Sequence, residues 1–386
     1  MDGWSLTKLI DFIDFNPYEN LQKGTIAKKV AMEQLLPFTR DISSYELAPF
    51  NGGSKFCNGD TLMARITPCL ENGKTAKVNI LDDGEIGFGS TEFIVLRAKP
   101  GISDSDFIYY LATSPLLRDK AIKSMVGSSG RQRVQQGVLN DIEFLAPPFD
   151  EQVEIGQTLR ALDDKIANNT AINHHLEQMA QAIFKSWFVD FEQVKSFTEV
   201  VQVLGGGTPK TTTAEYWHGS IPFFTPKDAI GLYVLTTEKS LSEIGLNNCN
   251  SQLYPANTVF VTARGTVGKL VMAGVPMAMN QSCYALVGND GYGQHFVYHL
   301  ALKTIEHLKH KASGAVFDAI VIRDFDSEIV VVPPIEDVKS FENKVKPIYE
   351  AILNNENESA HLATLRDTLL PRMVSGELSV ADLAIK

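Results

Sequence analysis

Two short motifs in the sequence contain residue types that hold phosphate groups in other proteins. Gly73-Lys74-Thr75 ends like a phosphate-binding loop, but Pro68 stands where such a loop needs its first glycine. The segment from Gly205 to Lys210 reads Gly-Gly-Gly-Thr-Pro-Lys, and Pro209 removes one of the backbone N–H donors that a phosphate cradle needs. No dinucleotide-binding spacing follows it. We interpret the second motif as a tight loop that enters a domain, and neither motif as a nucleotide site.

Other candidate catalytic or metal-binding residues are isolated. Asn16-Pro17-Tyr18 is close to the catalytic tetrapeptide of amino-methyltransferases, but the second proline and a glycine-rich cofactor motif are missing, which favours a turn. His174-His175 has no third ligand nearby. The cysteines are scattered, without a Cys-x-x-Cys pair: Cys57, Cys69, Cys249 and Cys283. We therefore expect a non-catalytic binding protein without a metal or cofactor of its own.

The segment from Gly127 to Gly137, Gly-Ser-Ser-Gly-Arg-Gln-Arg-Val-Gln-Gln-Gly, has the side chains that read DNA. Arginine and glutamine bond guanine and adenine edges bidentately, while lysines and hydroxyl groups bind phosphates. Surface loops are polar in any case, and for Arg131 and Arg264 a buried structural role is the alternative. The predicted DNA-contacting residues are Arg65, Lys74, Arg131, Gln132, Arg133, Gln135, Thr208, Lys210, Lys227, Arg264 and Lys269.

The formal charge of −11, from 35 basic and 46 acidic side chains, argues against nucleic acid at first sight. The excess of acid is spread evenly, at −3 in residues 1–150, −3 in 151–196, −2 in 197–332 and −3 in 333–386. No segment is a polybasic tail. If the chain binds DNA, we expect it to do so poorly alone and to rely on partners for phosphate-neutralising charge.

The composition, 44% apolar and 21% charged, is that of a globular protein, and 386 residues predict two or three domains. No apolar run approaches the eighteen residues of a membrane span, and the N-terminal residues lack the pattern of a signal peptide. We expect a cytoplasmic protein without a membrane partner.

The chain repeats one plan twice. Residues 147–192 match 333–378 without gaps at an offset of 186. Both segments begin with Pro-Pro, carry Ile-x-Asn-Asn and then place His-Leu nearby. The globular parts also match, for example Ala64-Arg65 with Ala263-Arg264, each followed by Gly-Lys. The predicted order is globular, helical, globular, helical.

The two helical segments carry apolar residues at three- and four-residue steps over more than three heptads, which predicts a coiled coil. Pro347 predicts either a kink or a new helix that begins there. Asn169 and Asn355 fall in the apolar seam, facing solvent or, as we favour, forming a buried polar pair that fixes register. The predicted coiled-coil and partner interface is Ile166, Asn169, Leu176, Ile183, Ile352, Asn355, Leu362 and Leu369.

The predicted fold class is α+β, with two globular domains separated by a pair of long antiparallel helices in a coiled coil and a pseudo-twofold internal repeat. We place the globular domains at 1–146 and 197–332. A central helical region occupies 147–196, and a distal one occupies 333–386.

With these features the chain resembles the specificity (S) subunits of type I restriction–modification enzymes. The segments that show the resemblance are Pro147 to Gln152, Ala182 to Phe191 and Leu365 to Leu378. The opening of the second globular domain, from Gly206 to Asp228, is similar to a target recognition domain of that family. The first domain lacks its Gly-Gly-Thr-Pro start.

The resemblance implies a non-catalytic subunit in which each target recognition domain reads one half of a split, asymmetric site in double-stranded DNA. The helices would set the unread spacer. It also implies two modification subunits, which bind S-adenosylmethionine and methylate adenine, and restriction subunits, which use ATP and Mg to translocate and cleave DNA. The alternative is an assembly or tethering protein whose two domains bind other proteins or a glycan. An enzyme with an unrecognised site is a third, disfavoured hypothesis.

Overall fold

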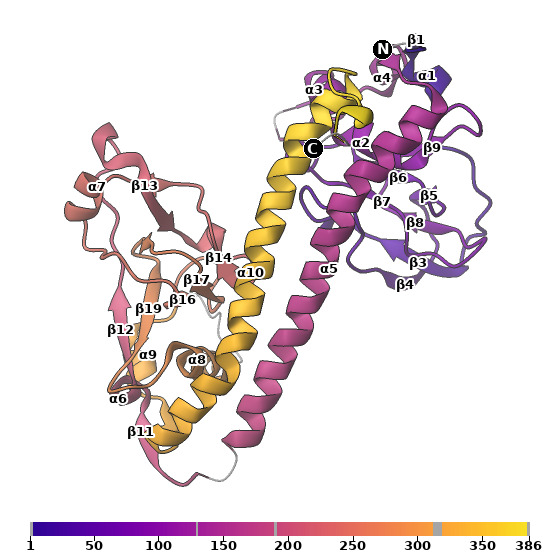
Figure 1. The fold of residues 1–386 in the computed structure, drawn as a ribbon. Coiled ribbons are helices and arrows are strands. Elements are labelled where there is room, and N and C mark those ends of the chain that lie inside the picture. The colour runs from indigo at the N-terminus through magenta and orange to yellow at the C-terminus, as the bar shows by residue number, and fades with distance from the viewer. Residues whose placement is uncertain (1–2, 129, 189–190, 312–318, 384–386) are drawn as a thin grey trace. The chain divides into compact units, whose positions relative to one another are not determined.

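The computed structural model describes residues 3–128, 130–188, 191–311 and 319–383. The chain forms two compact units. Unit 1 contains Met1–Ala167 and His361–Lys386, and unit 2 contains Asn168–Ala360. Each unit combines one globular domain with part of both long helices, α5 (Phe149–Trp187) and α10 (Ile335–Val374) (Figure 1).

The described residues of unit 1 form three sheets of short strands. The first is the antiparallel ribbon of β1 (Ser5–Lys8) and β10 (Glu143–Ala146). The second has the order β2 (Ile13–Phe15), β9 (Phe93–Ala98), β6 (Thr61–Ala64), β7 (Thr75–Lys77). The third has the order β4 (Glu46–Pro49), β3 (Ile26–Val30), β8 (Gly87–Gly89), β5 (Ser54–Phe56). Its shorter helices are α1 (Leu9–Phe12), α2 (Ser105–Thr113), α3 (Pro115–Lys123) and α4 (Gln136–Asn140), with 3-10 turns at Met32–Gln34 and Val380–Leu383.

Unit 2 repeats this plan. Its ribbon joins β11 (Val194–Ser196) to β20 (Ile329–Val331). Its main sheet has the order β12 (Val201–Gly205), β19 (Cys283–Gly288), β16 (Val259–Thr262), β17 (Leu270–Ala273), β14 (Tyr233–Val234). The third sheet has the order β15 (Ser240–Leu241), β13 (Trp217–Phe224), β18 (Ala278–Met279). Its shorter helices are α6 (Phe197–Val200), α7 (Glu243–Asn247), α8 (Gln294–Lys311) and α9 (Ile322–Asp326), with 3-10 turns at Ala214–Tyr216 and Pro226–Asp228.

The predicted internal repeat is therefore present in the topology. The order β2-β9-β6-β7 in unit 1 corresponds to β12-β19-β16-β17 in unit 2, and each ribbon leads through a short helix into the first strand of that order. The helices that follow the main sheet correspond as well, since buried Phe107 on α2 and buried Phe296 on α8 each belong to a core shared with the long helices. These features confirm the α+β fold with two copies of one domain.

The helix α10 is continuous through Pro347, so the expectation of a new helix that begins there is wrong, while the alternative of a kink stays a prediction. Pro347 is exposed, and the turn around it carries the fully buried Val345 and the nearly fully buried Tyr349. Burial of these side chains in the core of unit 2 offsets the hydrogen bond that proline removes.

The contacts between α5 and α10 show the relative direction of the two helices. In unit 2, Asn169 Nδ2 lies 3.2 Å from Ser359 Oγ, and Asn173 Nδ2 lies 3.2 Å from Glu356 Oε1. Because the residue number rises on α5 while it falls on α10, the pair is antiparallel, as predicted.

No helix in the described ranges has both the length and the apolar character of a membrane span.

Candidate nucleic-acid interface

The globular domain of unit 2 carries an open groove of about 350 Å³ whose lining includes Lys227, Arg264, Asn280 and Ser282. Arg264 follows β16, Lys227 lies in the 3-10 turn after β13, and Asn280 and Ser282 flank the turn between β18 and β19. The strands fix this arrangement, because Ala263 N donates to Ser282 O at 2.8 Å and Asn280 N donates to Phe224 O at 2.9 Å. Two of the predicted DNA-contacting residues, Lys227 and Arg264, therefore line the same groove as a polar turn.

The same turn exists in unit 1. Asn280 Oδ1 accepts from Ser282 N at 3.0 Å, and Ser90 Oγ accepts from Glu92 N at 3.1 Å. The residue after each matched alanine then donates its backbone N–H to the end of the turn, from Arg264 to Ser282 O at 3.2 Å and from Arg65 to Glu92 O at 2.9 Å. Arg65 and Arg264 thus occupy equivalent places, beside turns whose side chains differ.

Glu92 and Arg133 form a bidentate ion pair. Arg133 Nε lies 3.0 Å from both carboxylate oxygens, and Nη2 lies 2.6 Å from Oε1. These hydrogen bonds, with the charges of Arg133 and Arg65, hold the pKa of Glu92 below its usual range. Two predicted contact residues therefore converge on a carboxylate that is ionised at neutral pH and can accept hydrogen bonds from a base.

The backbone of the predicted reading loop is anchored on both sides. Arg133 N donates to Val126 O at 2.9 Å, and Thr67 N donates to Gln132 O at 3.0 Å. Gly127 has φ +142°, and a Cβ there would lie 2.8 Å from Arg131 O, so this position requires glycine. Arg131 and Gln135 are exposed, which leaves their side chains accessible. Ser129 of this loop lies outside the described residues, as do Ser313 and Gly314 in the second half of the chain.

Lys74 and Lys269 hold loops of their own domains. Lys74 Nζ donates to Met32 O at 2.8 Å, and Lys269 Nζ donates to Ala229 O at 3.2 Å. Since the two lysines are equivalent in the repeat and make the same kind of contact, these bonds indicate a bracing role. Their predicted contact with DNA would require release of those bonds.

The remaining predicted residues, Thr208 and Lys210, lie on the loop after β12. Thr208 Oγ1 is hydrogen-bonded to Gln281 Oε1, in the turn that lines the groove. Lys210 is exposed, and its backbone carbonyl accepts from Trp217 Nε1 at 3.3 Å. Trp217 also lies under the ammonium group of Lys239, 5.7 Å from its ring centre.

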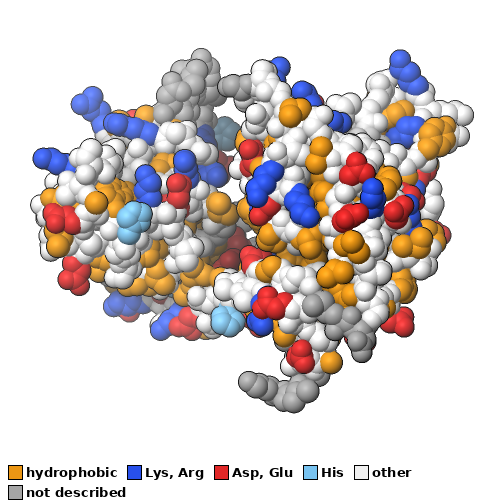
Figure 2. Space-filling model, turned by 90° about the horizontal axis from the view of Figure 1, so that it is seen from above, with side chains coloured by type: hydrophobic (Ala, Val, Ile, Leu, Met, Phe, Trp, Pro, Cys, Tyr) orange, Lys and Arg blue, Asp and Glu red, His pale blue; other side chains and the backbone are white. Residues whose placement is uncertain are grey.

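Sequence reasoning missed four residues at or beside this groove, and the structure identifies them: Lys239, Asn280, Gln281 and Ser282. The last three form a polar triplet between two buried apolar runs, a signal that could have marked a turn at a strand end. Lys239 has no such signal. On the face in view in Figure 2, the described basic and acidic side chains are interspersed, in agreement with the even spread of charge along the chain.

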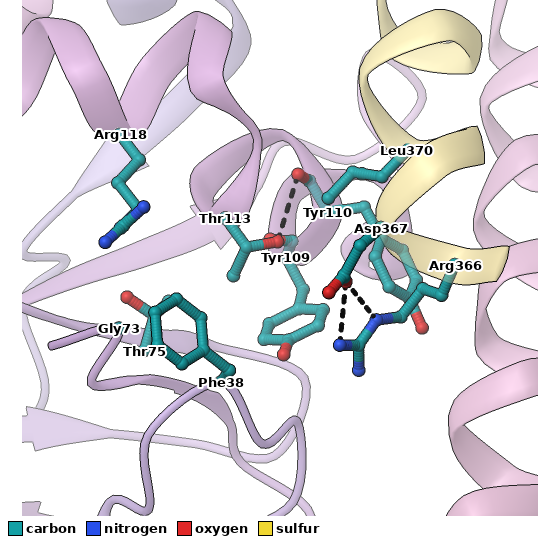
Figure 3. Close-up of a pocket in the computed structure, with 10 residues that line it drawn as sticks. All are labelled: Phe38, Gly73, Thr75, Tyr109, Tyr110, Thr113, Arg118, Arg366, Asp367 and Leu370. Carbon is teal, nitrogen blue, oxygen red and sulfur yellow. Dashed lines mark hydrogen bonds and ion pairs between the residues drawn. The ribbon is translucent and has the colours of Figure 1, made fainter. Parts of the chain in front are cut away.

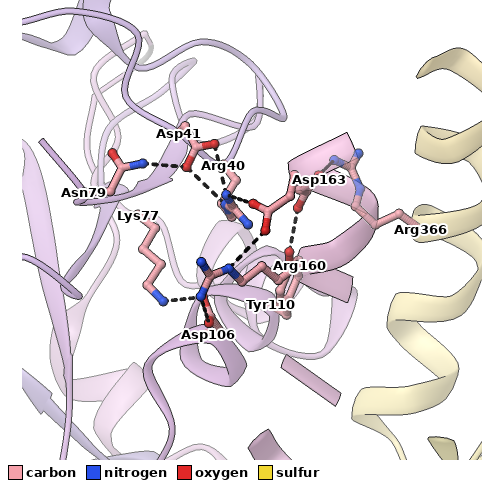
Figure 4. Close-up of polar contacts among 10 residues, drawn as sticks. Arg40, Asp41, Lys77, Asn79, Asp106, Tyr110, Arg160, Asp163 and Arg366 are labelled. Carbon is pink, nitrogen blue, oxygen red and sulfur yellow. Dashed lines mark hydrogen bonds and ion pairs between the residues drawn. The ribbon is translucent and has the colours of Figure 1, made fainter. Parts of the chain in front are cut away.

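Ion pairs in unit 1 connect its globular domain to α5, and α5 to α10 (Figure 4). Arg40 Nη2 lies 2.5 Å from Asp164 Oδ1, and Arg366 Nη1 lies 2.5 Å from Asp163 Oδ1. Tyr110 OH donates to Asp163 Oδ2 at 2.7 Å. Burial, together with the charge of Asp163, raises the pKa of Tyr110 well above its ordinary value, so the phenol stays a donor.

Beside these ion pairs, a small cavity of about 50 Å³ lies between part of the domain and α10 (Figure 3). Phe38 and Tyr109 enter it from the domain, and Asp367 and Leu370 enter it from α10. Arg118 stacks over Phe38 at 5.2 Å and donates to the backbone carbonyl of Glu71 at 2.7 Å. Arg118 therefore makes these contacts within unit 1.

The equivalent contact in unit 2 uses different chemistry. His299 corresponds to Tyr110 and Tyr349 corresponds to Asp163 in the repeat, and Tyr349 OH lies 2.8 Å from His299 Nε2. Burial and the neighbouring His295 and Lys303 lower the pKa of His299 to about 3. The imidazole is therefore neutral, and a hydrogen bond between two neutral groups stands where, in unit 1, the phenol of Tyr110 donates to the carboxylate of Asp163.

The helix seam contains the expected asparagines. Asn169 is 1% exposed and Asn355 is half-buried. Asn169 Nδ2 contacts Asn355 O at 3.4 Å and Ser359 Oγ at 3.2 Å, while Asn355 Nδ2 donates to Asn173 Oδ1 at 2.8 Å. Ser359 corresponds to Asn173 in the repeat, so the last two bonds are equivalent. The two asparagines therefore meet in the seam through a side-chain-to-backbone contact, and each side chain also bonds a polar side chain of the opposite helix.

The other predicted seam residues lie in or beside the cores. Ile352 is fully buried and Leu369 is 9% exposed. Leu176 and Ile183 pack against the core of unit 2. Ile166 and Leu362 are half-buried.

Among the described residues, no three His, Cys, Asp or Glu side chains are placed to hold a metal ion.

Comparison with known proteins gives one family for both halves of the chain. The family model described as type I restriction modification DNA specificity domain matches residues 20–178 and again residues 189–361. The HindI specificity subunit of Haemophilus influenzae is 25% identical, over 95% of this chain and 96% of the relative. The MjaIX specificity subunit of Methanocaldococcus jannaschii is 24% identical, over 72% and 70%.

The fold is similar to that of a type I restriction–modification S subunit from M. genitalium, with a TM-score of 0.57 at 15% identity over 96% of each chain. The two separate matches of the family model follow the internal repeat seen in the topology. The chain therefore belongs to the family of type I restriction–modification DNA specificity proteins.

Proposed function

We propose that this chain reads a bipartite, asymmetric DNA site for a type I restriction–modification complex, one half-site for each globular domain. The observation that carries the proposal is the repeated arrangement of an arginine beside a polar turn, Arg65 beside Ser90–Glu92 and Arg264 beside Asn280–Ser282. The two turns share their backbone hydrogen bonds but differ in their side chains. Two domains that bind half-sites of different sequence need this combination.

Specificity subunits are non-catalytic, and catalysis lies in other subunits of the type I enzymes. We propose two modification subunits as partners, with S-adenosylmethionine bound there, and restriction subunits that use ATP and Mg. The even acidity of this chain supports a division of labour in which partners neutralise much of the phosphate charge. Since the DNA target lies in the cytoplasm of a bacterium or archaeon, we place the complex there.

The test is selection from a library of random duplexes by the chain assembled with its modification subunits. We expect a motif in two parts with a fixed gap, and binding that weakens steeply with salt. A single contiguous motif would refute two-domain reading. Binding without any sequence preference would favour the assembly or tethering hypothesis.

A further inference from the structure

The ribbons β1·β10 and β11·β20 expose apolar side chains at the same positions of the repeat. Leu6 pairs with Leu145 across the first ribbon, and these side chains are 66% and 43% exposed. Val194 pairs with Val331 across the second, at 57% and 46%. The first member of each pair lies three residues before α1 or α6, and the second lies two residues before Pro-Pro. The two pairs are therefore equivalent.

The fold does not need these outward apolar residues. Strands at a surface alternate apolar side chains inward with polar side chains outward. The inward positions are already filled, because Phe144 packs on Phe12 with ring centres 5.1 Å apart and Val330 belongs to the core of unit 2. The polar turns differ between the two domains, as Glu92 and Ser282 show, whereas the outward apolar pair is kept. A surface kept in both halves suits one kind of partner bound twice.

Acidic residues adjoin both ribbons. The helix α5 begins with Asp150 and Glu151 in its first turn, and α10 begins with Glu336 and Asp337. In unit 1 the ribbon is tied to that turn, because Trp4 Nε1 donates to Glu151 Oε2 at 2.9 Å. Each apolar pair is thus followed along the sequence by two carboxylates, of which Glu336 also pairs with Lys339 Nζ at 2.8 Å. The remaining acidic charge complements a partner that presents cationic side chains next to apolar ones.

We propose that the outer faces of β1·β10 and β11·β20 are two equivalent docking surfaces, each of which binds one modification subunit through an apolar segment flanked by lysine or arginine. The inference rests on the proposed function, which supplies a partner present in two copies. The occupant is that subunit, and a second copy of this chain is the competing outcome of the test.

The test uses the full chain with its modification subunits and counts bound subunits by native mass spectrometry. One variant carries Leu6→Thr and Leu145→Thr, another carries Val194→Thr and Val331→Thr, and a third combines all four. Threonine is branched at Cβ and favours strands, so the ribbons are expected to stay folded, which thermal melting checks. Leu47→Thr on β4 is the matched control, since Leu47 is 68% exposed and lies outside the ribbons.

The wild type and the control are expected to bind two modification subunits, each ribbon variant one, and the combined variant none. The dissociation constant at an altered surface should rise at least about tenfold, which corresponds to about 1.4 kcal/mol. Two bound subunits in the combined variant would overturn the inference. So would an equal loss in Leu47→Thr, or disruption of a self-dimer with the modification subunits retained.

The inference and the proposed function fail in different ways. If the wild-type complex selects a bipartite motif while the ribbon variants still bind two subunits, only the docking surfaces are refuted. If the wild-type chain binds no modification subunit and selects no motif, the proposed function fails and the inference fails with it.

Discussion

The buried ion pair between Asp163 and Arg366 should carry much of the stability of unit 1. The side chains are only 6% and 12% exposed, and Asp163 also accepts from Tyr110 OH. Asp163→Asn keeps the shape but removes the charge, which leaves the guanidinium with the exposed Asp367 as partner. Removal of one partner of a buried pair costs about 3 to 5 kcal/mol. We expect about 3 kcal/mol here, because Asp367 retains part of the compensation.

For a unit of this size each kcal/mol shifts the melting temperature by about 2 to 4 °C, so Asp163→Asn should lower it by about 6 to 12 °C in calorimetry of the full chain. Asp367→Asn is the matched control, since its carboxylate is 64% exposed and contacts the same arginine. It should lower the melting temperature by no more than about 4 °C. Equal effects of the two variants would refute the assignment of the stability to the buried pair.

Three further predictions follow from the same geometry. Arg264→Ala and Arg131→Ala should each weaken DNA binding by the assembled complex by about 1 to 3 kcal/mol in a titration, and unchanged affinity would assign them structural roles. His299 stays neutral when folded, with a pKa of about 3 against an ordinary 6.5, so its stabilising contribution is complete above pH 6.5 and declines as pH falls towards 3. The wild type should lose about 2 kcal/mol of unfolding free energy at pH 5 from this group alone, and His299→Gln should remove that loss in denaturant titrations; an equal pH dependence would reject it. Insertion of four helical residues around Asn168–Thr170, matched in α10 near Asn355 to keep the asparagine pair, should lengthen the gap of the DNA motif by about one or two base pairs and leave both halves unchanged, as methylation mapping would report.

The sequence was sufficient for the helices and the repeat because both are encoded locally. Apolar side chains at three- and four-residue steps identify α5 and α10, and the offset of 186 correctly aligned Asn169 with Asn355, which meet in the seam. At Pro347 the helix continues where a new helix was one of the two expectations, because burial of Val345 and Tyr349 outweighs the local preference of proline.

Only some of the residues that line the groove of unit 2 could be predicted from the sequence. Arg264 and Lys227 were named, but Lys239 and Asn280 join them only through sheet pairing between strands distant in the chain. The direction of a long side chain is also not encoded locally. Lys74 and Lys269 were recognised as a repeated Gly-Lys, whereas their hydrogen bonds to loop carbonyls follow from the fold.

Methylation mapping after domain exchange tests most directly whether each globular domain reads its own half-site. Residues 197–332 are replaced by the corresponding domain of a relative with another target, and the chain is expressed with its modification subunits. One half of the methylated motif should change, while the other half and the gap stay as in the wild type. A change in both halves, or a motif that ignores the exchange, would contradict the account.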